Sequence, residues 1–391
     1  MSFEKIDGYR DELVSLRRDF HRHPELAFEE RRTAGRVAEL LRSYGYEVHT
    51  GLADTGVVGV LRAGAASGDA AGRCRTIGLR ADMDALPIEE LNQFDHRSSH
   101  PGKMHACGHD GHTTMLLGAA RYLAETRRFD GCVVLIFQPA EENGGGAQVM
   151  IEQGLFERFP VDAVYGMHNM PGMPLGDFAL RSGPMLAAVD IFEAAVICRG
   201  GHAAMPHLAE DAVLVACQVV QAWQGIVSRN VDPLASAVVS TTCIHGGEAS
   251  NVLPERVVLR GCVRTFDEPV QALVEERMRR LGTAIAEASG MRFELDYRRT
   301  YPATVNHAAQ SERFADAAAE VGERVERELP PIMGSEDFSF MLRARPGAFL
   351  MAGQGEGAGL HTPYYDFNDD LLTLGAKLWA RLVERELPLG R

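Results

Sequence analysis

The sequence predicts an α/β fold, a mostly parallel β-sheet flanked by helices, into which a smaller ferredoxin-like α+β domain is inserted. In the first and last parts of the chain, strand-like apolar runs alternate with helix-like segments, which is typical of parallel sheets covered by helices. In the middle, the order changes to strand, helix, strand, strand, helix, strand, which is the ferredoxin-like plan. We therefore expect residues 1–184 and 300–391 to form one discontinuous domain around an insert of residues 185–299.

The elements of the larger domain follow from apolar periodicity and from continuous apolar runs. Before the insert we expect helices at 8–20, 29–44 and 112–126, strands near 46–49, 56–62, 76–79, 132–137 and 163–167, and a surface loop at 63–72. After about residue 305 the alternation returns, with a strand-like run at 348–351.

The insert has its own regular order of elements, and it is compact enough to be a separate domain. We expect strands at 188–197, 236–244, 256–266 and 291–298, and helices at 209–229 and 270–288.

Composition and charge restrict the class of protein. The chain has 391 residues, 46% of them hydrophobic, which is enough for two domains with substantial cores. A formal net charge of −14 argues against nucleic acid or an anionic membrane as a partner. No apolar stretch approaches the roughly 18–20 residues that cross a bilayer, and the first residues lack the pattern of a signal peptide. Seven scattered cysteines fit reduced thiols, so we expect a cytoplasmic protein.

The strongest functional signal is the segment Met104–His112 (MHACGHDGH), which contains Cys107 and three histidines. Thiolates, imidazoles and carboxylates are ligands of zinc and of its neighbours in the first transition row. Further residues of these types follow strand-like runs along the chain: Asp82 and Asp84 after 76–79, Glu141 and Glu142 after 132–137, His168 after 163–167, and His361 after 348–351. In open α/β sheets, ligands bind at the carboxyl ends of the strands.

Each of these residues also has an ordinary structural interpretation. A histidine-rich stretch can be a surface loop, Cys107 can be a small buried apolar residue, and paired glutamates usually lie on a solvated face. The arrival of ligand-type residues at four strand ends favours a metal site for the set. The adjacent glutamates suggest a hydrolase, because one can bind metal while its neighbour moves protons.

Short motifs spread over nearly the whole chain closely resemble the metallo-amidohydrolase family of hippurate hydrolases, N-acyl-amino-acid amidohydrolases, plant auxin-conjugate (IAA-amino acid) hydrolases, aminoacylases and carboxypeptidases. The motifs are HRHPEL at 21–26, RADMDALP at 80–87, MHACGHD at 104–110, QPAEE at 138–142, GGHAAMPH at 200–207, SNVLP at 250–254, SEDF at 335–338 and LHTP at 360–363. The resemblance implies a zinc-exopeptidase-like catalytic domain and an insert that acts as a lid and dimerisation domain.

The resemblance also implies a site for two divalent ions, Zn²⁺, Mn²⁺, Ni²⁺ or Co²⁺. Cys107 would bridge the ions, His109 and His168 would complete the ligands of one, and Glu142 and His361 those of the other. A bridging thiolate makes physical sense because it offsets part of the charge of two neighbouring cations.

Asp82 and Asp84 are expected to support the ligands by accepting hydrogen bonds from ligand histidines. The alternative for both is a turn after a strand, and for Asp82 this alternative remains open. His21, His23, His105 and His112 are expected to be structural.

The implied reaction hydrolyses the amide bond of an N-acyl amino acid and releases a carboxylic acid and an amino acid. The ions would lower the pKa of a water molecule, while Glu141 would take its proton and return a proton to the leaving amine. By resemblance, His202 would stabilise the carbonyl oxyanion, often from the partner subunit, and Asn251 and Arg264 would contact substrate. Their alternatives are a turn cap, a tight turn and an outward-facing strand residue.

Three other functions remain to be distinguished. A dipeptidase, aminoacylase or carboxypeptidase would use the same chemistry with a different substrate pocket. A thiol hydrolase would use Cys107 with His109, but it would leave Glu142, His168 and His361 without a role. A non-catalytic binding protein would be expected to lack Glu141 or a ligand, and this chain has them all. We expect a homodimer or higher homo-oligomer through the insert, from the resemblance alone.

Overall fold

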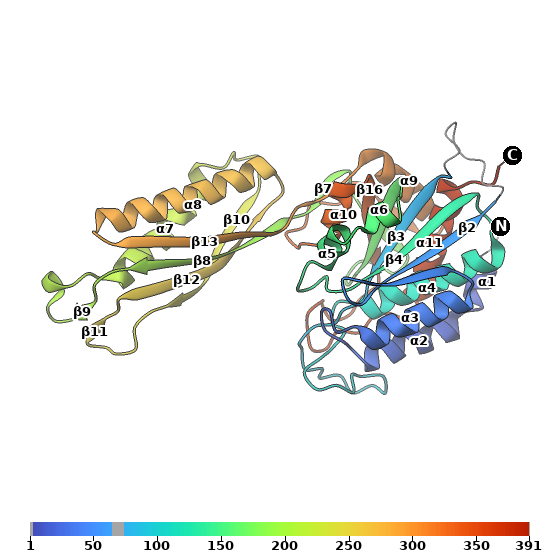
Figure 1. Ribbon diagram of the computed structural model, residues 1–391, viewed down its shortest axis with the longest axis horizontal. Helices are drawn as coiled ribbons and strands as arrows, with labels where there is room; N and C mark the ends of the chain where they lie inside the picture. The colour runs from blue at the N-terminus through green and yellow to red at the C-terminus, as the bar shows by residue number, and fades with distance from the viewer. Residues whose placement is uncertain (1–2, 65–73, 391) are drawn as a thin grey trace. The chain divides into compact units, whose positions relative to one another are not determined.

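The computed structural model describes residues 3–64 and 74–390. By its internal contacts the chain divides into two compact units. Unit 1 consists of residues 1–183, 305–330 and 337–391, and unit 2 of residues 184–304 and 331–336. Figure 1 shows the helices and strands of both units. Most of the loop expected at 63–72 lies outside the described residues.

Unit 1 is built on an eight-stranded sheet with the strand order β1-β2-β4-β3-β5-β16-β6-β15. The strands are β1 (Glu47–Leu52), β2 (Gly56–Ala63), β3 (Thr76–Asp82), β4 (Gly131–Gln138), β5 (Ala163–Met170), β6 (Asp177–Ala179), β15 (Arg324–Glu326) and β16 (Gly347–Gly353). The central pairs β3–β4, β3–β5 and β5–β16 are parallel, as is β6–β15. The pairs β1–β2, β2–β4 and β6–β16 are antiparallel. The predicted α/β class with a mostly parallel sheet is confirmed.

Helices cover both faces of this sheet (Figure 1). They are α1 (Glu4–Asp7), α2 (Arg10–Arg22), α3 (Arg31–Ser43), α4 (His109–Thr126), α5 (Gly146–Glu152), α6 (Leu155–Arg158), α9 (Ala308–Ala319), α10 (Phe338–Ala344) and α11 (Leu371–Glu386). Helices α2, α4, α9 and α11 form one group through mutual contacts, and α5, α6 and α10 form another. Because both faces are covered, the central strands are mostly apolar, and every residue of β4 and β16 is buried.

Helix α4 begins three residues before the expected start at 112, so that His109 is its first residue. The preceding Gly108 has a φ of 95°. A Cβ atom at Gly108 would lie 2.4 Å from Asn169 Oδ1, so a side chain would meet both a strained backbone and a polar neighbour. This close turn places Cys107 and His109 at the amino end of the helix, facing the end of the sheet.

Unit 2 is a four-stranded antiparallel sheet in the order β10-β12-β8-β13, with helices α7 and α8 on one face (Figure 1). The elements are β8 (Ala188–Ile197), α7 (Ala212–Arg229), β10 (Ala237–His245), β12 (Arg256–Thr265), α8 (Glu268–Ala288) and β13 (Arg292–Tyr301). Numbered along the chain, the spatial order of the strands is 2-3-1-4, which is the ferredoxin-like arrangement. Trp223 of α7 is buried in its core against Phe192, and its indole N–H donates to the Met278 carbonyl at 3.1 Å.

The remaining elements are short. They are β7 (Gly183–Leu186) and β14 (Thr304–Asn306) at the two chain crossings, the paired strands β9 (Gly201–His202) and β11 (Val252–Leu253), and a single 3₁₀ turn at Pro206–Leu208. Among the residues that the structure describes, no helix is both long enough and apolar enough to cross a membrane.

Candidate metal centre and active site

The ligand-type residues of unit 1 gather at the carboxyl ends of neighbouring strands. Asp82 is the last residue of β3, and Glu141 and Glu142 lie in the turn after β4. His361 lies in the loop that follows β16. His168 differs from the expectation, because β5 continues to Met170 and the histidine lies inside the strand. Since the central strands are parallel, these ends meet at one edge of the sheet.

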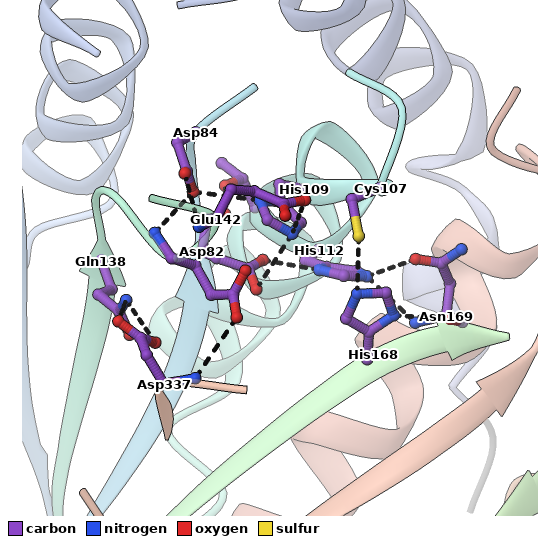
Figure 2. A network of polar contacts seen from close by, with 12 residues as sticks. Asp82, Asp84, Cys107, His109, His112, Gln138, Glu142, His168, Asn169 and Asp337 are labelled. Carbon is purple, nitrogen blue, oxygen red and sulfur yellow. Dashed lines mark hydrogen bonds and ion pairs between the residues drawn. The ribbon is translucent and has the colours of Figure 1, made fainter. Parts of the chain in front are cut away.

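Five donor atoms form two groups that share one sulfur. Cys107 Sγ lies 3.2 Å from His168 Nε2 and 3.3 Å from His361 Nε2. Donors of Cys107, His109 and His168 lie within 4.8 Å of one another, and so do donors of Cys107, Glu142 and His361. Figure 2 shows Cys107 pointing at His168, with His109 and Glu142 beside it. Two groups with a common thiol suit a pair of ions bridged by one sulfur.

The Nδ1 contacts of His109 and His168 leave Nε2 of each ring as the atom that could bind a metal ion. His168 Nδ1 lies 2.7 Å from the Asn169 carbonyl, and therefore donates to it. His109 Nδ1 lies 3.2 Å from Asp84 Oδ1. His109 Nε2 is buried and has no hydrogen-bond partner in the described part of the chain. A buried imidazole nitrogen in this state, fixed from behind by a carboxylate, fits a metal ligand.

The electrostatics of the centre also suit cations. Burial raises the pKa of the Cys107 thiol well above its ordinary value, and the nearby Glu142, Glu141 and Asp82 carboxylates raise it further. Burial opposes protonation of His109, but Asp82 and the hydrogen bond to Asp84 outweigh it and raise the pKa to about 10. Without ions, the centre therefore holds protons that metal binding would displace.

Asp84 is the main support of the two neighbouring ligand segments. Its Oδ1 accepts the backbone N–H of Glu141 at 3.0 Å, and its Oδ2 accepts that of Glu142 at 3.0 Å. The same carboxylate bonds His109. The Glu141 side chain is 6% exposed, and its Oε1 lies 3.4 Å from the Asp337 N–H. The backbone of the glutamate pair is thus fixed by Asp84, and Figure 2 shows Asp84 beside Glu142.

Asp82 does not lie in a turn, because it ends β3. Its Oδ1 lies 2.6 Å from His112 Nδ1, and its Oδ2 accepts from Arg80 Nη1 at 2.8 Å. His109 Nε2 is 3.6 Å from the same oxygen. Figure 2 shows His112 between Asp82 and Asn169. His112 is therefore part of the layer directly behind the donors.

His21 and His23, also expected to be structural, have hydrogen-bond partners outside the donor groups. His21 is buried, with Nδ1 2.8 Å from Asp110 Oδ2 and Nε2 3.2 Å from Glu90 Oε1. His23 Nδ1 donates to the Asp19 carbonyl at 2.9 Å.

Sequence reasoning assigned no role to a buried polar group that lies behind the donors. The Arg80 side chain is fully buried and donates to Gln138, Asp82 and Asp337. Asp337 Oδ2 also accepts from the Ala147 N–H at 2.9 Å. One signal was available, since Arg80 is a cation inside an apolar strand and a buried cation needs anionic partners. Nothing in the sequence indicated that those partners would include Asp337, far along the chain.

The three expected substrate contacts lie in unit 2. His202 of β9 pairs with Val252 of β11, and its Nδ1 accepts the Ala204 N–H at 3.1 Å, which leaves the proton on Nε2. Asn251 is next to it, because its carbonyl accepts the Ala203 N–H at 3.0 Å.

Arg264 is on β12, away from that strand pair. Its Nη1 donates to Ser335 Oγ at 3.0 Å. Within unit 2, His202 and Asn251 therefore lie together. Arg264 is instead bonded to Ser335, which belongs to the segment 331–336 of the same unit.

Comparison with known proteins agrees with this geometry. The model of peptidase family M20/M25/M40 matches residues 78–385. The chain belongs to this family. The resemblance inferred from the motifs is confirmed.

Other members of the family, some of known structure, align over almost the whole chain. It is 41% identical to hippurate hydrolase of Campylobacter jejuni over 385 residues, covering 98% of both chains. It is 39% identical to IAA-amino acid hydrolase ILR1-like 4 of Arabidopsis thaliana, covering 99% of this chain and 88% of that one. A dinuclear metal binding peptidase from the M20 family of Bacillus subtilis superposes with a TM-score of 0.83 at 32% identity, covering 96% of this chain and 98% of the other.

Proposed function

We propose that this M20 family protein is a metal-dependent amidohydrolase that cleaves the amide bond of N-acyl amino acids. The observation that carries the proposal is the pair of donor groups sharing Cys107, with the Glu141 carboxylate beside them. Relatives named hippurate hydrolase, IAA-amino acid hydrolase and N-acetyl-L-cysteine deacetylase, each at least 38% identical, support this class of substrate.

Two divalent ions bound here would lower the pKa of a water molecule and polarise the amide carbonyl. Cys107, His109 and His168 would hold one ion, and Cys107, Glu142 and His361 the other. Thiolate and imidazole donors suit Zn²⁺, Mn²⁺, Co²⁺ or Ni²⁺. Asp84 and Asp82 would keep the donors oriented and add negative charge behind them.

Glu141 is the proposed general base. Its carboxylate lies beside the donor groups, and its backbone is held by Asp84. It would take a proton from the attacking water as the oxygen bonds to the amide carbon. It would return a proton to the amine nitrogen as the carbon–nitrogen bond breaks, which yields a carboxylic acid and an amino acid.

Residues of unit 2 would complete the site. His202 Nε2–H would donate to the carbonyl oxygen as negative charge develops there, from the same chain or from a partner subunit. Asn251 would contact substrate, and Arg264 would bind its α-carboxylate with a two-pronged hydrogen bond. We also propose a homodimer through unit 2 and a cytoplasmic location; the seven free cysteines support a reducing compartment.

The decisive experiment compares Glu141→Gln with the parent protein on a panel of N-acyl amino acids and dipeptides. Glutamine is nearly the same size but cannot take a proton, so kcat should fall by about three or more orders of magnitude. Two ions per chain should still bind, measured by elemental analysis. A Glu141→Gln protein with near-normal turnover would remove Glu141 from this role.

The panel also separates the neighbouring functions. Relatives named thermostable carboxypeptidase at 38% identity make peptide substrates the second candidate. Activity lost on chelation and restored by added Zn²⁺, Mn²⁺, Co²⁺ or Ni²⁺ supports a metal enzyme. Activity that survives chelation would instead favour a thiol hydrolase using Cys107, and absence of turnover on the whole panel would favour a binding protein.

A further inference from the structure

One buried carboxyl group next to the centre has no part in the mechanism above. Glu30 is completely buried and forms the N-cap position of α3. Its side chain reaches away from that helix. Oε1 accepts the Ala140 N–H at 2.9 Å, and Oε2 accepts the Thr55 hydroxyl at 2.6 Å. Ala140 is the residue directly before Glu141.

Helix α3 does not need the Glu30 carboxyl for its own stability. The free amides of its first turn are capped by Glu25, whose two oxygens accept the N–H groups of Arg32 at 2.9 Å and Thr33 at 2.8 Å. The Glu30 side chain makes no cap hydrogen bond to α3. The two glutamates therefore have different roles. Glu25 caps α3, and Glu30 holds the loop after β4.

That loop is fixed by three successive amides. The Ala140 N–H points to Glu30, and the N–H groups of Glu141 and Glu142 point to the two oxygens of Asp84. Ala140 itself has a φ of 56°, in the left-handed region that residues with a Cβ atom rarely adopt. Such a conformation persists only where its surroundings hold it, and the Glu30 carboxyl is the group bonded to its amide.

The other oxygen of Glu30 is anchored in a second constrained turn. Thr55 lies in the turn between β1 and β2, directly after Ala53 and Asp54, which have φ values of 48° and 62°. Gly56 follows, and a Cβ atom there would lie 2.4 Å from the Leu52 carbonyl oxygen. Glu30 thus ties two tight turns from different parts of the chain to one another.

We propose that Glu30, oriented by Thr55, is a positioning residue for the glutamate pair. By holding the Ala140 amide it keeps the left-handed turn that aims Glu141 at the reacting water and Glu142 at the second ion. This inference rests on the proposed function of Glu141. An error of about 1 Å in the placement of a catalytic group can cost about a hundredfold in rate, so the loss of one such anchor has a measurable effect.

The first experiment measures kcat and KM of Glu30→Ala at saturating metal. We expect kcat to fall about 10- to 100-fold with KM changed less than about threefold, because the base moves while the substrate contacts remain. Glu30→Gln keeps an oxygen acceptor for the Ala140 amide and should recover most of the lost kcat.

A double-mutant cycle separates positioning of Glu141 from any other effect. In the Glu141→Gln background the base is already absent, so Glu30→Ala should lower the residual kcat by less than about threefold. Equal losses in both backgrounds would overturn the proposal. The parent and Glu141→Gln proteins test the proposed function in the same series, so a failure of that function is recognised separately.

Two measurements on the metal-free protein do not depend on activity. Hydrogen exchange in peptides covering residues 138–147 should become faster in Glu30→Ala, and Zn²⁺ titration should show about tenfold weaker binding of one of the two ions. Glu25→Ala is the matched control from the same segment. It removes the α3 cap and should lower stability, but exchange at 138–147 and kcat should stay unchanged.

If Glu30→Ala does not fold, Thr55→Val carries the same test. It removes the hydroxyl that orients the carboxyl but retains the shape of the side chain. A threefold or greater loss of kcat in Thr55→Val, absent in the Glu141→Gln background, supports the positioning role. Unchanged kcat and unchanged exchange at 138–147 in the variants that fold would overturn it.

Discussion

At the residue scale, the Asp84 carboxylate connects several parts of the centre. It accepts the amides of Glu141 and Glu142 and bonds the ring of His109. One side chain therefore sets the position of a proposed ligand from α4, a proposed ligand from the loop after β4, and the proposed base. Because all these bonds go to charged oxygens in a buried place, removal of the charge affects several groups at once.

Asp84→Asn should therefore weaken metal binding. The asparagine side chain retains one oxygen acceptor, but its NH₂ group cannot accept the backbone N–H that it would face. The negative charge next to His109 is also lost. Zn²⁺ affinity, measured by competition with a chelator, should fall about 10- to 100-fold. Asp11→Asn, at a fully exposed carboxylate, is the control and should bind Zn²⁺ like the parent.

The sharing of Cys107 between the two donor groups gives a prediction for stoichiometry. Cys107→Ala should lose both ions, since each group loses a donor. His361→Ala should retain the ion held by Cys107, His109 and His168, because it affects only the other group. Metal content per chain after dialysis checks both; equal losses in the two variants would contradict a shared sulfur.

How far the sequence predicts single residues depends on their chemistry. Cys107, His109 and His168 could be proposed because ligand-type residues follow several strand-like runs and because their motifs resemble those of a known family. Arg80 and Asp337 could not, because charged residues are common and their pairing is a long-range contact. Glu30 was missed for the same reason, since its partner Ala140 has no polar side chain to reveal it.

At the element scale, α2 and α4 are joined by a buried ion pair below the centre. His21 of α2 bonds Asp110 of α4, and Arg17 of α2 lies 3.6 Å from the same carboxylate. Burial works against the charge on His21, but the hydrogen bonds to Asp110 and Glu90 prevail and raise its pKa to about 9. The pair thus ties the helix that begins with His109 to a neighbouring helix.

This raised pKa predicts a pH dependence of stability. The ordinary pKa of histidine is about 6.5, so the folded protein binds the proton more tightly than the unfolded chain. The stabilisation is complete below pH about 6.5, and it is lost as pH rises through about 9. Urea unfolding of the metal-free protein and of His21→Gln should therefore give a stability difference that shrinks between these values. A constant difference would show that His21 does not titrate there.

The elements with strong periodicity were predicted closely. The strand expected at 188–197 is β8, and the helix expected at 270–288 lies within α8. The start of α4 was placed too late, because Gly108 and His109 give no apolar signal and the helix begins through a glycine turn. Strands β6 and β15, at one end of the sheet, have three residues each, which is too short for a pattern to show.

At the scale of the whole molecule, the two units contain one tryptophan each. Trp223 is buried in unit 2, and Trp379 of α11 stacks on Phe314 in unit 1. The proposed ligands Cys107, His109, His168, Glu142 and His361 all belong to unit 1. The interruption of the larger domain could be expected from the order of elements along the chain. The grouping of residues 331–336 with unit 2 could not, because that segment has no periodic pattern.

The tryptophans make the stability of each unit measurable. Zn²⁺ bound at the proposed centre would stabilise the folded form of unit 1, so it should raise the urea midpoint reported by Trp379 in a Trp223→Phe variant. The midpoint reported by Trp223 in a Trp379→Phe variant should change much less. Equal shifts in both variants would mean that the units unfold together.

The discontinuity of unit 1 has a consequence for how the protein is made. During translation, Cys107, His109, Glu142 and His168 leave the ribosome before unit 2, whereas His361 emerges only after unit 2 has been completed. A nascent chain therefore presents all three proposed donors of one ion, but only two of the three proposed donors of the other. At the proposed centre, the first ion could therefore bind before release from the ribosome, and the second ion could bind only after the insert and His361 have been synthesised.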